Sequence, residues 1–178
     1  MDERMKMLLN EAHAEFRRLR SGELGDNLRA QGVTYRIVWG VESYHLRNIA
    51  ARLNDGLDDD ARLALAEALW HEDVRESRML APRICPPEAM TRPMANEWAE
   101  SVPYTELADQ LCMHLLARTT FAPDLVHQWL TDTSRPMLLY MALQLALRLD
   151  IAVPCAGNIA HDTNLPMWVR SVANRMPA

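Results

Sequence analysis

Three of the five tryptophans recur at nearly even intervals through the centre of the chain. They are Trp70, Trp98 and Trp129, separated by 28 and 31 residues. Each lies near the end of one predicted helix, and a short polar stretch and a second, apolar helix follow it. Such a helix pair, repeated about every 30 residues, is typical of α-solenoids of the HEAT or armadillo kind. The alternative interpretation is that three core tryptophans share a similar spacing by chance.

Prolines divide the second half of the chain into short helices. Four of them stand where the first turn of a helix is predicted, at Pro103, Pro123, Pro136 and Pro166. Short helices joined by a few residues pack as antiparallel neighbours. Pro82 falls inside a helical pattern, where we expect it to kink or end the helix. The predicted fold is therefore all-α, an α-α superhelix of antiparallel helix pairs like a HEAT or armadillo solenoid.

Helical periodicity also marks the first part of the chain. Residues 4–20 predict a first helix, which Gly22 and Gly25 are expected to end. Residues 26–39 contain a β-branched and aromatic run, but nothing else in the chain is strand-like enough to pair with it. We therefore expect an irregular connector or a short helix there.

Two helix starts are predicted from capping chemistry. Ser43 is the expected N-cap of a helix. Residues 58–60 are three aspartates, which favour the positive end of a helix dipole, so we expect them to open a helix that runs to Trp70.

We interpret residues 1–178 as a single helical-repeat domain, because the length fits one ordinary domain. Residues 1–39 would form N-terminal helices and a connector, and residues 40–151 the HEAT-like repeats. Residues 152–178 would contain a C-terminal capping helix, with Trp168 covering the open end of the solenoid.

The charge is acidic overall and unevenly distributed. The net charge is −5, and residues 54–110 carry five basic against thirteen acidic side chains. This balance excludes a strongly basic nucleic-acid binder as a description of the whole molecule. A local arginine-lined face stays open, with solvated helix faces as the alternative. Its candidates are Arg17, Arg18, Arg20, Arg29 and Arg36.

The sequence indicates no membrane segment, metal or cofactor. The most apolar run, residues 137–147, is shorter than the roughly 20 residues that span a bilayer and predicts a buried helix. Cys85, Cys112 and Cys155 include no CxxC pair, which predicts buried free thiols in a reducing cytoplasm. The histidines are scattered, and no glycine-rich nucleotide motif or serine-hydrolase elbow occurs. Together with a charged start unlike a signal peptide, these features predict a cytoplasmic protein.

Polar residues gather where the second helix of a repeat begins. They are Arg75, Glu76 and Arg78 after Trp70, and Tyr104, Glu106 and Asp109 after Pro103. Asp109 heads an otherwise apolar helix, and an isolated carboxylate is costly to bury unless it is paired. Two interpretations stay open for Asp109: a bond to a neighbouring helix or an arginine such as Arg78, or a functional role.

Three segments, in order, resemble one protein family. Residues 40–50 (GVESYHLRNIA) resemble its first motif, and residues 65–81 (LAEALWHEDVRESRMLA) resemble its Leu-Trp repeat with a following Glu-x-Arg. Residues 98–115 resemble its central helix, which carries a tryptophan and an aspartate. The family is the AlkD-like DNA alkylation repair proteins, which are HEAT-like-repeat DNA glycosylases. The resemblance covers roughly residues 28–150.

The resemblance implies a function and a set of site residues. Members of this family cradle duplex DNA and remove positively charged alkylpurines by hydrolysing the N-glycosidic bond, with an aspartate that stabilises the cationic sugar. That aspartate corresponds to Asp109, which we expect to be catalytic. Tyr104 would supply stacking, and Arg75, Arg78 and Arg36 would contact DNA.

The chain departs from the family at two places. Tyr104 and Thr105 stand where the family has a tryptophan beside the aspartate. Pro136, Leu138 and Leu139 replace a later aromatic residue and two arginines. The alternative hypothesis is therefore a non-catalytic helical scaffold that binds a protein partner or nucleic acid and has lost the glycosylase activity.

Overall fold

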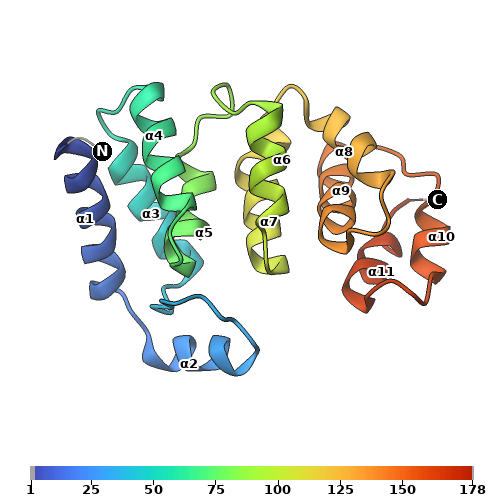
Figure 1. Ribbon diagram of the computed structural model, residues 1–178, viewed down its shortest axis with the longest axis horizontal. Helices are drawn as coiled ribbons and strands as arrows, with labels where there is room; N and C mark the ends of the chain where they lie inside the picture. The colour runs from blue at the N-terminus through green and yellow to red at the C-terminus, as the bar shows by residue number, and fades with distance from the viewer. Residues whose placement is uncertain (1–2, 178) are drawn as a thin grey trace. The chain divides into compact units, whose positions relative to one another are not determined.

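The computed structural model describes residues 3–177, and its regular structure there is helical, with eleven α-helices and one short 3-10 helix (Figure 1). The sole β-like feature of these residues is an isolated bridge between Ile37 and Val74. The chain separates between Ala89 and Met90 into two compact units, which we describe in turn. The all-α class that the proline and tryptophan patterns predicted is confirmed.

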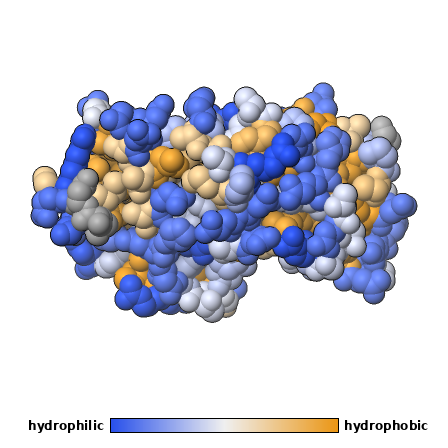
Figure 2. Space-filling view, turned by 45° about the horizontal axis from the view of Figure 1, so that its top comes forward, coloured by the Kyte–Doolittle hydropathy of each residue, from blue (hydrophilic) through white to orange (hydrophobic). Residues whose placement is uncertain are grey.

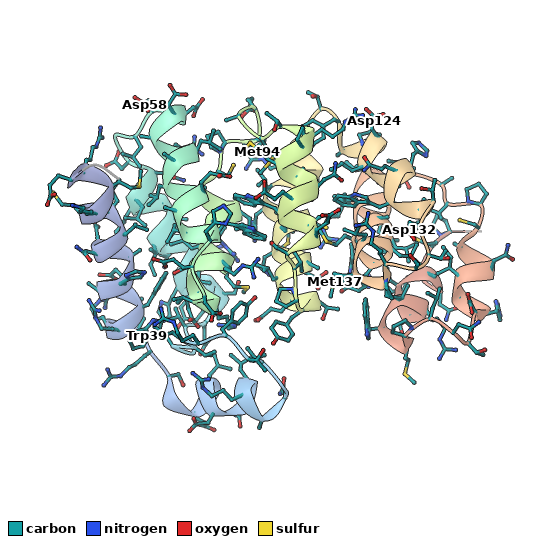
Figure 3. The ribbon with its side chains drawn as sticks, in the orientation of Figure 1. Trp39, Asp58, Met94, Asp124, Asp132 and Met137 are labelled. Carbon is teal, nitrogen blue, oxygen red and sulfur yellow. The ribbon has the colours of Figure 1, made fainter. Side chains whose placement is uncertain are left out.

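The first unit contains five helices, and two of them begin after a residue whose side chain caps the helix. They are α1 (Glu3–Arg18), α2 (Gly22–Ala30), α3 (Ser43–Asn54), α4 (Asp59–Trp70) and α5 (Arg75–Ile84). Asp58, labelled in Figure 3, caps α4 through its carboxylate, which accepts a hydrogen bond from the Ala61 N–H. The helix predicted from residue 58 to Trp70 is therefore confirmed. The prediction of Ser43 as an N-cap is wrong: Glu42 is the N-cap residue of α3, and Ser43 is the first helical residue, with its hydroxyl accepting a hydrogen bond from Arg83.

The prediction that Gly22 and Gly25 end the first helix is wrong. Both belong to α2, which runs crosswise to the other helices of its unit in Figure 1. For Gly25 the reason is tertiary, because its backbone packs against the backbone of Gly40. Gly40 has a φ of +71°, and a Cβ there would lie 2.2 Å from the Ser21 carbonyl oxygen. Only glycine at position 40 allows this approach.

The connector between α2 and α3 is held by the start of α5. Glu76, fully buried, accepts hydrogen bonds from the backbone N–H groups of Trp39, Gly40 and Val41 at 2.9, 3.0 and 3.3 Å. Its neighbour Arg75 donates to Glu76 at 2.8 Å and to the Val41 carbonyl at 3.3 Å. The irregular connector predicted within residues 26–39 is thus present after α2 and is anchored by a buried ion pair.

The second unit is built around one long apolar helix. Its elements are α6 (Arg92–Glu100), α7 (Thr105–His114), the 3-10 turn η1 (Leu116–Arg118), α8 (Ala122–Leu130), α9 (Pro136–Leu149), α10 (Ala156–His161) and α11 (Met167–Ala173). Helix α9 contacts α6, α7, α8 and α11, and its residues 138–146 are all buried. The apolar run predicted as a buried helix is confirmed.

The tryptophan pattern corresponds to successive helix pairs. Trp70 ends α4, and Trp98 and Trp129 lie near the ends of α6 and α8. All three are at most 2% exposed, and a second helix follows each after a short turn. Pro82 is accommodated two residues before the end of α5, so it ends the helix rather than interrupting it.

The three cysteines of the chain differ in their burial. Cys85 and Cys112 are buried free thiols, whereas Cys155 is partly exposed, contrary to the prediction of full burial.

No helix within residues 3–177 is long and apolar enough to cross a membrane. Hydrophilic residues cover most of the face in Figure 2, with hydrophobic residues between them. The large hydrophobic residues that stay exposed within the described chain are Met7, Tyr44, Met113, Met167 and Trp168.

Candidate functional site

Asp109 lies at the centre of the candidate site, on α7 in the second unit. Helix α7 buries Leu107, Ala108 and Leu111 against its neighbours, and Asp109 borders this apolar face in a half-buried position. Its carboxylate Oδ1 accepts a hydrogen bond of 3.0 Å from the hydroxyl of Tyr140 on α9. The bond from Asp109 to a neighbouring helix, which was one of the interpretations left open by the sequence, is therefore present.

A row of polar side chains on α9 continues from this contact. Tyr140, Gln144 and Arg148 are spaced by four residues, which places them on one face of the helix. The Gln144 amide donates to the Tyr140 hydroxyl at 2.8 Å, and the Arg148 guanidinium donates to the Gln144 side-chain oxygen at 2.9 Å. A continuous hydrogen-bonded chain thus runs from the arginine to the Asp109 carboxylate, and it fixes the direction of the Tyr140 hydroxyl.

Trp168 adds an aromatic surface beside this chain. It lies on α11, which packs against α9 through a face that includes the buried Val169 and Val172. The indole and the Tyr140 ring have centroids 5.4 Å apart and planes at 71°, an edge-on contact. Because Trp168 is 37% exposed, part of its indole remains available to another molecule.

Burial dominates the electrostatics of the carboxylate. Loss of solvent raises the pKa of Asp109 above its ordinary value, although the Tyr140 hydrogen bond and the charges of Arg148 and Arg175 act in the opposite direction. Burial also raises the pKa of Tyr140 to about 12, so its hydroxyl stays protonated at neutral pH. The site therefore combines a partly desolvated carboxylate with a fixed neutral hydrogen-bond donor.

This arrangement suits the stabilisation of a positive charge. An ionised carboxylate with few waters around it attracts a nearby cation more strongly than an exposed one does. Three or more His, Cys, Asp or Glu side chains placed to hold a metal ion are not found among residues 3–177.

The other predicted site residues lie in different surroundings. Tyr104 is the N-cap residue of α7, five positions before Asp109, and is partly exposed. Arg75 is only 4% exposed and is occupied by Glu76 and the connector, which disfavours a phosphate contact. The guanidinium of Arg78 lies 4.7 Å from the centre of the Trp70 ring, where burial lowers its pKa. Arg36 is exposed and lines a cavity of the first unit.

Sequence reasoning missed four members of the cluster. The apolar pattern predicts a core helix at α9, which contains Tyr140, Gln144 and Arg148. Their spacing of four residues is the sequence signal that could have indicated a shared polar face. Trp168 is predicted as a cap, because nothing local shows that α11 places it beside Tyr140.

Comparisons with known proteins agree with the helical architecture. One solved structure, described as "a new family of proteins related to the HEAT-like repeat DNA glycosylases with affinity for branched DNA structures", matches with a TM-score of 0.73. It is 18% identical, and the match covers 98% of this chain and 73% of that chain. At this identity the likeness establishes a HEAT-like repeat fold. No curated protein sequence matches the chain.

A family model supplies the second comparison. The model described as "DNA alkylation repair enzyme" matches residues 12–136, well over half of the 178 residues. The match includes α7 and Asp109 and ends at the first residue of α9. The chain therefore belongs to the DNA alkylation repair enzyme family.

Proposed function

We propose that the protein binds DNA and excises alkylated purine bases by hydrolysing the N-glycosidic bond, with Asp109 as the catalytic carboxylate. One observation carries this proposal. The Asp109 carboxylate is half-buried, held by the Tyr140 hydroxyl and accompanied by the partly exposed indole of Trp168. Family membership supports the reaction class and the choice of Asp109, and the contacts of Tyr140 and Trp168 support the proposed role of the carboxylate.

The reaction needs a negative charge at the sugar. When the bond from C1′ to the base nitrogen breaks, both bonding electrons leave with the base, so a cationic alkylpurine departs neutral. Positive charge develops on the sugar, where the ionised Asp109 stabilises it. Water then bonds to C1′ and loses a proton to solvent, which completes the hydrolysis. Trp168 would pack against the sugar or the departing base, and Tyr104 would supply further stacking from the start of α7.

The size of the electrostatic effect is sufficient for measurable catalysis. A carboxylate about 4 Å from a developing cation contributes roughly 4 kcal/mol at an effective dielectric near 20. That energy corresponds to about a thousandfold in rate. Because Asp109 is only half-buried, we expect Asp109→Asn to lower the rate of base release by about 100- to 1000-fold.

DNA contacts would come from one exposed and one partly buried arginine. Arg36 is accessible to a phosphate, and Arg78 would contribute from its position over Trp70. Arg75 is not part of the proposal, because its guanidinium is buried and holds the connector. The structural relative's described affinity for branched DNA supports DNA as the partner.

Base release from methylated duplex DNA tests the catalytic role. The native protein should release alkylated purines, and Asp109→Asn should release them much more slowly. The matched control is Asp150→Asn, which removes the same charge at an exposed position with φ of 54°, a backbone conformation that asparagine also adopts readily. Equal rates for the native protein and Asp109→Asn would remove the carboxylate from the mechanism.

The alternative function, a non-catalytic scaffold, is favoured by a specific observation. Helix α9 begins with Pro136 and continues with Leu138 and Leu139, where the family has arginines, and the net charge is −5. A salt titration of DNA binding separates the two functions. A face that contacts phosphates predicts an affinity that falls steeply between about 50 and 200 mM salt, whereas a protein-binding scaffold predicts no DNA binding at either concentration.

A further inference from the structure

A polar cavity lies in the first unit, whereas Asp109 lies in the second. Its volume is about 330 Å³, and it is bounded by α1, the connector before α3 and the turn between α4 and α5. Trp39, labelled in Figure 3, stands on the connector beside the C-terminal end of α1. The side chains that line it include those of His13, Arg17, Arg36, Trp39, Glu72 and Asp73.

Two arginines supply the positive charge of this cavity. Arg17 is exposed and makes no hydrogen bond or ion pair within residues 3–177. Arg36 is also exposed, and its charge acts on Glu72 across the cavity. Guanidinium groups suit phosphate oxygens, because their planar N–H donors match the geometry of the anion.

The two carboxylates of the cavity already have basic neighbours. Glu72 Oε2 is bonded to His13 Nε2 at 2.8 Å and accepts a second bond from the Ser77 hydroxyl. These contacts, with Arg36, keep the pKa of Glu72 below its ordinary value despite partial burial. Asp73 interacts electrostatically with Arg78. An incoming anion would meet Arg17, whose charge is not shared with these acids, and Arg36, whose charge is shared with Glu72.

Trp39 provides a positioned aromatic face. Its backbone N–H donates to the buried Glu76 at 2.9 Å, and its carbonyl accepts from the Ser21 N–H at 3.1 Å. The backbone is thus fixed on both sides, while the half-buried indole lines the cavity. A fixed aromatic face beside cationic side chains is the arrangement on which single-stranded bases stack.

We propose that this cavity binds one unpaired nucleotide of a DNA strand, with its base against Trp39 and its phosphate between Arg17 and Arg36. The inference rests on the proposed DNA-binding function and adds a site that the catalytic cluster does not include. The cavity is of the size that holds a small ligand, which fits one nucleotide. A base inside a duplex cannot use it, because both of its faces are stacked on neighbouring bases.

Binding of a short oligothymidine strand to the full chain tests the proposal. Trp39→Leu should weaken this binding by about tenfold, because the stacking surface is removed while an apolar side chain remains. The double variant Arg17→Gln with Arg36→Gln should weaken binding and reduce the salt slope by roughly 0.7 for each phosphate that is no longer neutralised. The control removes two other exposed arginines of the same unit, Arg20→Gln with Arg47→Gln, and should leave the affinity nearly unchanged.

The outcomes separate the cavity from the proposed function. Equal losses of affinity in the two double variants would overturn the cavity and indicate a general charge effect. Absence of oligothymidine binding, or binding that Trp39→Leu leaves intact, would also overturn it. Duplex binding and base release are measured in parallel on the same native protein. If both persist while the strand fails to bind, only the cavity proposal is overturned, and if neither persists, the proposed function fails as well. Thermal unfolding of each variant verifies that the fold is retained.

Discussion

At the scale of single residues, Asp109 is held in a position that costs stability. Its pKa is raised, so the folded protein binds the Asp109 proton more readily than the unfolded chain does. The corresponding stabilisation is complete below the unfolded pKa and is lost as pH rises through the folded pKa. At neutral pH the ionised carboxylate therefore opposes folding, as is common for groups placed for function.

The raised pKa of Asp109 leads to a prediction for Asp109→Asn. At neutral pH the variant should be more stable than the native protein, by about 1 kcal/mol or less, because the neutral amide avoids the desolvation of a charge and its oxygen can still accept from Tyr140. At a pH below about 3, where aspartate is protonated in both states, the difference should vanish. Urea unfolding at the two pH values measures this. A variant that is less stable at neutral pH would contradict the assignment.

At the scale of elements, the start of α5 determines where the connector lies. Glu76 and Arg75 are buried together, and between them they bind four backbone groups of residues 39–41. The Glu76 carboxylate accepts hydrogen bonds from three consecutive backbone N–H groups, which have no partner in a helix or strand. The same contacts position Trp39 over the cavity of the first unit.

Glu76→Gln should be strongly destabilising. The substitution removes the charge of Glu76 that pairs with the buried Arg75 guanidinium, and breaking a buried ion pair typically costs about 3–5 kcal/mol. The control Glu88→Gln removes an exposed carboxylate near the end of the same unit and should change stability by less than about 0.5 kcal/mol. Denaturant unfolding of both variants tests the comparison, and similar small effects would show that the buried pair is not what holds the connector.

Gly40→Ala should disrupt the contact between α2 and the connector. A Cβ at this position would lie 2.2 Å from the Ser21 carbonyl and 2.7 Å from the Gly25 nitrogen, at a φ that alanine disfavours. We expect a loss of about 2–4 kcal/mol in the free energy of unfolding. Gly22→Ala, where a Cβ meets nothing within 4 Å, should be nearly neutral in the same assay. If Gly40→Ala were as harmless, the close backbone approach would be wrong.

Sequence patterns predicted the elements well where the signal is local. Asp58 and Trp70 mark both ends of α4 because capping and burial act within one helix. Gly25 was misassigned because glycine also serves close packing between segments, which a terminator rule does not consider, whereas Gly22 begins α2 without any such close contact. Asp109 was found through family resemblance, whereas Tyr140 and Trp168 reach it through contacts between α7, α9 and α11 that no local pattern encodes.

At the scale of the whole molecule, the chain carries two proposed sites, one in each compact unit. The second unit holds Asp109 and its hydrogen-bonded chain, and the first holds the arginine-lined cavity. The single-domain interpretation of residues 1–178 stays a prediction. With a net charge of −5, the proposed DNA binding would depend on local arginines rather than on the field of the whole protein.

The most direct test of the central claim is the pH dependence of base release by the native protein and by Tyr140→Phe. The account requires an ionised Asp109, so release from methylated duplex DNA should fall on acidification, after release without protein is subtracted. The Tyr140 hydrogen bond lowers the pKa of Asp109, so its loss in Tyr140→Phe should move this fall to higher pH. An absence of release by the native protein, or an identical acid limb in both proteins, would contradict catalysis by Asp109 in this site.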